Sequence, residues 1–272
     1  MTQGFTRPFT PGGTASILAP LPWKFAYDLL VIHFRTDPKA LAKYLPAPLT
    51  PLDDSGEAFL WSPRIICHPV AGDPAAQDPA QSGYNVCVIA IPAKLNGKPT
   101  MFSAFQWCDR DWLIVLSWFI GATSKGAVIE QTSVHPLMDK LGSPNSGKLG
   151  GQIHRTVSRF GNRVIDMTFR PDREIAVKDM DFFTSKLPLT GMRHLPDIHI
   201  PPTGKPPIHD LVQQVMTQTT FGTPLAGAAT LKFFDVANEE LMPIAPKEVL
   251  GGYSLPMANL LEGIRVVHDY NA

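Results

Sequence analysis

Residues 85–108, NVCVIAIPAKLNGKPTMFSAFQWC, decide the fold of this chain. Residues 85–94 and 100–108 are rich in β-branched, aromatic and other apolar side chains, which is typical of buried strands. Asn96-Gly97 stands between them, and this dipeptide readily takes the positive φ angles of a two-residue hairpin turn. The stretch therefore predicts two antiparallel strands joined by a tight turn.

A second hairpin is predicted where residues 152–160 and 163–169 flank Gly161-Asn162. Many short strands with few helices indicate an α+β fold that is mostly antiparallel β, and a closed barrel is one form that such a sheet takes. Three further strands are predicted at residues 27–34, 57–70 and 228–236.

Two short helices are predicted. The first begins at Pro38 with Asp37 as its N-cap, and Pro46 and Pro48 end it. The second covers residues 209–216. Neither helix is long enough to change the expectation of a β-rich fold.

The domain organisation is predicted to be simple. Residues 1–22 are rich in Pro, Gly and Thr and are expected to form an extended arm, whereas residues 23–272 form a single domain. The first residues lack the basic and then apolar pattern of a signal peptide. A cytoplasmic location is therefore expected.

The composition limits the partners of the protein. The 272 residues include 24 basic and 24 acidic side chains, so the formal net charge is zero and neither nucleic acid nor an anionic membrane is expected as a partner. Cys67, Cys87 and Cys108 are odd in number and stand among apolar residues. Free buried thiols are expected rather than disulfides.

Residues 112–130, WLIVLSWFIGATSKGAVIE, contain one unusual lysine. Between Asp111 and Glu130 the only ionisable side chain is that of Lys125. Desolvating an ammonium group is costly, so an isolated lysine either reaches water along its stem or stays neutral, and a neutral lysine is a nucleophile. Polar residues and glycines interrupt the second half of the stretch, so it is expected to be core and not a transmembrane helix.

Other motifs support no specific function. Residues 142–148, GSPNSGK, match a phosphate-binding loop except that Leu149 replaces the hydroxyl residue that binds magnesium, and a surface loop is expected. His194, His199 and His209 lack the ligand spacing of a zinc site, so no metal is predicted. No GxSxG nucleophile elbow is present.

Short motifs along most of the chain, from about Trp23 to Tyr270, resemble those of the acetoacetate decarboxylase family. Lys125 follows Asp109 by sixteen residues, and this spacing matches the family without a gap. The other matching residues are Lys24-Phe25, Arg35-Thr36-Asp37, Ala40-Leu41, Leu45-Pro46, Pro48-Leu49, Ala90-Ile91-Pro92, Asn96-Gly97, Leu255-Pro256 and residues 266–270.

The resemblance implies a fold and an activity. The fold is a cone-like closed β-barrel, and Lys125 forms a Schiff base with a small oxo acid inside it. The implied enzyme is a homo-oligomeric lyase without a cofactor that by default decarboxylates a 3-oxo acid such as acetoacetate. Aldol or dehydration chemistry on a larger oxo acid is an alternative, and so is ligand binding without catalysis.

The chain departs from the family at several positions. Gly126 replaces a second lysine, so desolvation by the apolar residues near Lys125 would have to keep its amine neutral. A family glutamate falls on Val86, and a cavity arginine falls on Tyr27 or Asp28. The apolar residues expected to desolvate the amine are Trp118, Phe119, Ile120 and Val128.

Other side chains are therefore expected to bind the substrate. Arg64 is a candidate for a bidentate pair with a carboxylate. Tyr84, Gln106 and Tyr253 are candidates for hydrogen bonds or proton transfer, and Trp118 is a candidate for apolar contact. Each of these five has a purely structural alternative, because a buried Tyr or Gln usually satisfies a backbone group.

Overall fold

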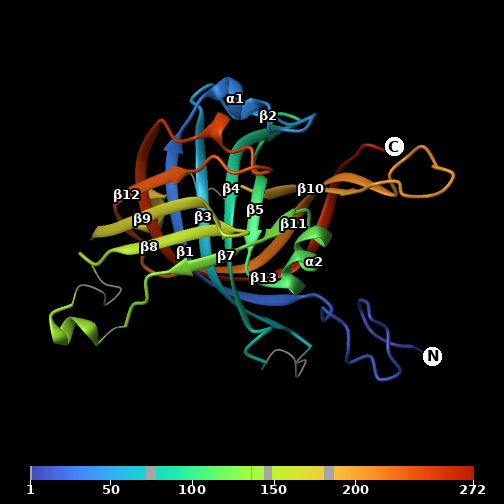
Figure 1. Cartoon of the computed structure of the whole chain (residues 1–272), viewed down its shortest axis with the longest axis horizontal. Helices are drawn as coiled ribbons and strands as arrows, with labels where there is room; N and C mark the ends of the chain where they lie inside the picture. Colours follow the sequence, from blue (N-terminus) through green and yellow to red (C-terminus); the bar gives the residue numbers. More distant parts are fainter. Residues whose placement is uncertain (1, 72–77, 136, 144–148, 181–186) are drawn as a thin grey trace.

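The computed structural model describes residues 2–71, 78–135, 137–143, 149–180 and 187–272. Seven strands form a closed ring, because the last of them pairs with both its neighbour in the sheet and the first strand (Figure 1). The ring order is β1 (Trp23–Arg35), β3 (Glu57–Pro69), β4 (Gly83–Leu95), β5 (Lys98–Cys108), β10 (Leu189–Leu195), β11 (Ile208–Phe221) and β13 (Glu248–Asp269).

The same sheet continues beyond β13 as a second layer that covers one side of the ring (Figure 1). This layer consists of β12 (Leu225–Phe233), β9 (Asn162–Glu174), β8 (Ile153–Arg159) and β7 (Val128–Gln131). Two short strands pair at the ring, β2 (Thr50–Pro51) with β4 and β6 (Ser124–Gly126) with β5. Among the described residues, the α-helices are α1 (Pro38–Ala42) and α2 (Asp111–Phe119), and three 3-10 turns cover Met138–Leu141, Val177–Asp179 and Met242–Ile244.

The two faces of the ring have different surroundings. Side chains from β1, β3, β4, β5, β10 and β13 meet in one apolar cluster, so this face is the interior of the ring. The opposite face, called the outer face below, packs against β8 and β9. The interior cluster contains Leu29, Val31, Phe59, Ala90 and Met101, with Tyr27, Trp61, Leu189, Tyr253 and Met257 packed on it.

One end of the interior is closed by α2. Trp112, Leu113 and Leu116 of this helix pack with Trp23, Phe25 and Tyr84 of the ring. Gly121 follows α2 with a φ of 81°, and a Cβ atom there would lie 2.5 Å from Val212 Cγ2. Only glycine fits this turn, which returns the chain to β6.

The local predictions are largely confirmed. Asn96 and Gly97 have φ angles of 51° and 78°, and they join β4 to β5 as expected. Asp37 Oδ1 accepts hydrogen bonds from the amides of Lys39 and Ala40, so it caps α1. The second hairpin also forms, but its turn residues are Phe160 and Gly161, one position earlier than predicted.

The predicted helix at residues 209–216 is wrong, because these residues lie inside β11. This strand pairs with β10 on one side and with β13 on the other, and it buries Leu211 and Val212. Hydrogen bonds on both edges outweigh the weak helical preference of the segment.

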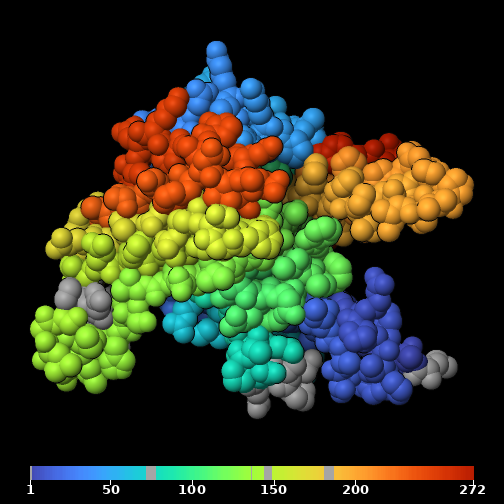
Figure 2. All heavy atoms as spheres, viewed as in Figure 1, coloured from blue at the N-terminus to red at the C-terminus, as the bar shows by residue number. Residues whose placement is uncertain are grey.

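The arm preceding β1 folds back on itself. Gln3 pairs with Thr10, and Leu18 is buried against the end of the ring that α2 closes. In Figures 1 and 2 this segment (blue) and the connection between β10 and β11 (orange) project from the body of the protein.

Three smaller expectations have different outcomes. The thiols of Cys67, Cys87 and Cys108 are free and buried, as predicted. Residues 144–148 of the loop GSPNSGK lie outside the described residues. Within the part of the chain that the structure describes, no helix is both long and apolar enough to cross a bilayer.

Candidate functional site

The short strand β6 decides which side chains reach the interior of the ring. It pairs in parallel with β5, so Ser124 lies beside Gln106 and Lys125 lies beside Trp107. Because side chains alternate along a strand, Ser124 and Lys125 project to opposite faces. Gln106 pairs with Val88, which shares its face with the interior residue Ala90. Ser124 therefore faces the interior, and Lys125 faces outward.

The interior face carries a small group of polar side chains. Gln106 Nε2 donates a hydrogen bond of 2.6 Å to Ser124 Oγ, and both residues are buried. Ser103 lies near Gln106 on the same face, and its buried hydroxyl has no hydrogen-bond partner among the described residues. Burial raises the pKa of the neighbouring Cys108 thiol, and hydrogen bonds with Arg110 and Ser124 oppose this shift. We call Ser103, Gln106, Cys108 and Ser124 the interior polar cluster.

Lys125 belongs to a different cluster on the outer face. Its Nζ donates to the carbonyl oxygen of Asn238 at 2.7 Å and lies 3.1 Å from Glu239 Oε2. Trp107 Nε1 donates to the same carboxylate oxygen at 3.0 Å, and Arg159 Nε lies 3.2 Å from Oε1. Only 3% of the Glu239 side chain is exposed, so this buried carboxylate joins the ring to the second layer.

The expectation that apolar residues desolvate Lys125 is wrong. The lysine side chain is 37% exposed. Trp118 and Phe119, at the end of α2, are 47% and 46% exposed, and Val128 is 60% exposed. The buried residues of α2 end at Ser117, so the two aromatic rings that follow at its C-terminal end are partly in solvent.

The other predicted binding residues divide between the interior and the surface. Gln106, Tyr84 and Tyr253 face the interior. Tyr84 packs edge-on against the Trp112 ring with centroids 5.3 Å apart, and burial raises its pKa well above the ordinary value. Arg64 is exposed beside Asp28 on the outer face and Trp118 is exposed on α2, so the structure does not bring these two side chains together with the interior groups.

Sequence reasoning missed several interior groups. Ser124 could have been found from strand alternation, because two adjacent residues of a strand cannot both face the interior. Tyr27 OH donates to Asn259 Oδ1 at 3.2 Å, and burial raises the pKa of this phenol. Ser103 carries no local sequence signal, since its burial depends on strands distant in the chain.

Arg155 is a second buried cation that sequence reasoning missed. It lies on β8 with 2% of its surface exposed, and its guanidinium donates to Ser62 Oγ at 3.0 Å and to Gln131 Oε1. Burial lowers the pKa of Arg155 to about 10. Because Ser62 alternates with the interior residue Trp61, Arg155 lies between the two layers and not in the interior.

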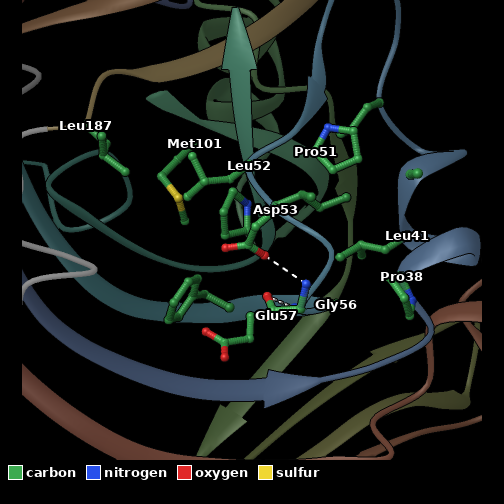
Figure 3. A pocket seen from close by; sticks show the side chains of 15 residues that line it. Pro38, Leu41, Pro51, Leu52, Asp53, Gly56, Glu57, Met101 and Leu187 are labelled. Atoms are coloured by element: carbon green, nitrogen blue, oxygen red, sulfur yellow. Dashed lines mark hydrogen bonds between the residues drawn. The ribbon is translucent and has the colours of Figure 1, made fainter. Parts of the chain in front are cut away.

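A cavity of about 100 Å³ lies where the ring meets α1 (Figure 3). Phe59, Met101 and Leu187 line it and also pack in the interior cluster, so the cavity extends from the interior. Asp53 and Glu57 contribute carboxylates, and Glu57 Oε2 lies 2.9 Å from His33 Nε2. Among the described residues, no three His, Cys, Asp or Glu side chains gather as a metal site requires.

Solved structures of other proteins share this fold. The enduracididine biosynthesis enzyme MppR, solved with pyruvate, is 23% identical, with 99% of each chain covered and a TM-score of 0.83. An acetoacetate decarboxylase-like enzyme from Sphingomonas wittichii RW1 is 23% identical, with 98% of this chain and 99% of that chain covered and a TM-score of 0.86. An acetoacetate decarboxylase is 18% identical, with 98% and 96% covered and a TM-score of 0.78.

No curated protein matches the chain. The model of the family described as acetoacetate decarboxylase matches residues 6–271, which is nearly the whole chain. This protein therefore belongs to the acetoacetate decarboxylase family.

Proposed function

We propose that this protein is a lyase-type enzyme that acts on a small oxo acid inside the ring. Membership of a family of such enzymes supports the substrate class. The observation that carries the proposal is the buried hydroxyl of Ser103, which has no hydrogen-bond partner among the described residues and lies near Gln106 on the interior face. Buried polar groups are rarely left unpaired, and a bound polar ligand would satisfy this one.

Decarboxylation of a 3-oxo acid is the default reaction. The bond between the carboxylate carbon and the α-carbon breaks, and its electron pair moves toward the carbonyl group. An enzyme accelerates this step by stabilising the negative charge that develops on the carbonyl oxygen. Either a protonated imine or a set of hydrogen-bond donors can supply that stabilisation.

The imine route would use Lys125, as the family resemblance implies. Both of its partners, Asn238 O and the Glu239 carboxylate, accept hydrogen bonds from an ammonium group. These contacts hold the amine on the outer face, so the lysine would have to leave Glu239 and reach the other face of β6 to form an imine. The geometry therefore supports the hydrogen-bond route better.

The proposal is tested by a substrate screen. The protein is incubated with acetoacetate, pyruvate and several longer 2-oxo and 3-oxo acids, while released carbon dioxide and carbonyl absorbance are measured. Release of carbon dioxide supports decarboxylation, whereas a change in absorbance without gas supports aldol or dehydration chemistry. Calorimetric binding without turnover supports a ligand-binding protein, and absence of both binding and turnover contradicts the proposal.

A further inference from the structure

We infer that Ser124, oriented by its hydrogen bond with Gln106, binds the carbonyl oxygen of the substrate, and that Lys125 stays bound to Glu239 and forms no imine. This inference rests on the proposed function, because it names the residues that act on an oxo acid in the interior. It differs from the chemistry that the family resemblance implies, in which the lysine of this segment is the nucleophile.

Two independent sets of contacts define the faces of β6. On the interior face, the hydrogen bond of 2.6 Å between Gln106 and Ser124 fixes the orientation of the serine. On the outer face, Lys125 and Trp107 donate to the same oxygen of Glu239. A one-residue shift of β6 would exchange the two side chains, but it would break the hydrogen bonds of Ser124 with Gln106 and of Lys125 with Glu239.

Ser124 is suited to donate a hydrogen bond to a ligand. Its oxygen accepts from Gln106 Nε2, so its hydroxyl hydrogen can be donated to another acceptor. Its other neighbour is the Cys108 thiol, which is a weak hydrogen-bond partner. A substrate carbonyl is a stronger acceptor than a thiol, so it would take this hydrogen bond.

The apolar surroundings strengthen such a contact. Ser124 is 5% exposed and Gln106 is 9% exposed, and the interior contains mostly aliphatic and aromatic side chains. Hydrogen bonds that are held in place before the reaction are most effective where water is excluded. Ser103, near Gln106 on the same face, offers a further hydroxyl.

The resulting reaction needs no covalent intermediate. The carbon–carbon bond to the carboxylate breaks, carbon dioxide leaves, and the electron pair forms an enolate whose oxygen accepts the hydrogen bond from Ser124. The α-carbon then takes a proton from water, and the enolate becomes the ketone. Atoms and charge balance when the substrate anion and one water molecule yield carbon dioxide, the ketone and hydroxide.

The inference is tested by reduction with borohydride in the presence of the best oxo acid, followed by peptide mass spectrometry. Wild-type protein is expected to give no adduct on Lys125. Lys125→Met is expected to keep kcat within about threefold, whereas Ser124→Ala is expected to lose about 100-fold, as removal of one such donor does elsewhere. An adduct on Lys125, or loss of turnover in a folded Lys125→Met variant, would overturn the inference.

A gain-of-function variant tests the geometry directly. Ser124→Lys combined with Lys125→Met is expected to place an amine in the interior and to give a reducible imine at position 124. Ser124→Thr keeps the hydroxyl and is expected to retain most activity, which separates loss of the donor from loss of packing. Thermal denaturation of each variant verifies folding. If the double variant is unfolded, the comparison of Ser124→Ala with Ser124→Thr tests the inference.

Failure of the proposed function would have a different signature. If wild-type protein neither turns over nor binds any oxo acid, the proposed function is wrong, regardless of which face of β6 each side chain takes. The double variant with a simple aldehyde as probe would then still report whether the amine at position 124 reacts faster near neutral pH than the exposed lysines, as a desolvated interior amine does. A faster reaction there supports the geometry, and its absence in a folded variant contradicts it.

Discussion

Lys125 Nζ lies 3.1 Å from Glu239 Oε2, and this ion pair connects the ring to the segment that follows β12. The carboxylate is almost completely buried and also accepts a hydrogen bond from Trp107. Such a carboxylate needs its cationic partners, because a buried charge without a partner is strongly destabilising. The ion pair therefore gives Lys125, the isolated lysine of an apolar stretch, a structural role.

The first prediction concerns the charge of Glu239. Glu239→Gln leaves Arg159 and Lys125 without a carboxylate and is expected to lower the free energy of unfolding by about 3 kcal/mol, as breaking a buried pair does. Glu248→Gln is the control, because Glu248 is 56% exposed and pairs with Arg35 at the surface, where a pair contributes less than about 1 kcal/mol. Urea unfolding measures the free energy of unfolding of both variants, and equal losses of stability would contradict the prediction.

The second prediction concerns the unpaired hydroxyl of Ser103. A buried hydroxyl without a partner costs about 1–3 kcal/mol, so Ser103→Ala is expected to stabilise the free protein. If the hydroxyl binds substrate, the same change is expected to raise KM for the oxo acid. Thermal unfolding and steady-state kinetics measure the two effects. A destabilised variant would show that the hydroxyl has a partner in solution.

The third prediction concerns pH. Burial lowers the pKa of His33 below its ordinary value of 6.5, and the hydrogen bond to Glu57 opposes this shift. Below pH 6.5 the unfolded chain binds a proton that the native protein does not, so stability is expected to fall as the pH drops below that value. His33→Gln is expected to weaken this dependence. Urea unfolding at pH 7.5 and 5.5 measures the free energy of unfolding at each pH. If the variant loses as much stability between these two pH values as wild-type protein does, other groups cause the pH dependence.

The fourth prediction concerns assembly. The family resemblance implies a homo-oligomer, and the connection between β10 and β11 projects from the body (Figure 2) with Ile198 and Ile200 82% and 99% exposed. Large exposed apolar side chains that lie close together favour contact with another copy. Replacing both with serine is expected to lower the mass measured by light scattering. Phe160→Ser is the control, since Phe160 is 92% exposed at the turn between β8 and β9.

A wild-type protein that is monomeric at all concentrations would contradict this fourth prediction. A lower mass in the Phe160→Ser control would instead place the contact between copies at the turn that joins β8 to β9.

The sequence by itself determined the features that depend on neighbouring residues. Asn96-Gly97 closes a hairpin because only a few dipeptides accept its backbone angles, and Asp37 caps α1 because its carboxylate reaches amides two and three residues ahead. The motifs of the family, spread along the chain, also indicated the closed β fold. The turn and the cap depend on a few adjacent residues, and the family motifs are compared with the chain one position at a time.

Only the tertiary structure decided which face of β6 each side chain takes. Three residues do not define a strand register, and the register of β6 depends on its pairing with β5. Glu239, which lies 114 positions from Lys125 in the sequence, reaches the lysine only because the second layer folds over the ring. In the same way, residues 209–216 became a strand because two distant strands hydrogen-bond to them. Contacts between distant segments outweigh local preference wherever both edges or both faces of a segment are buried.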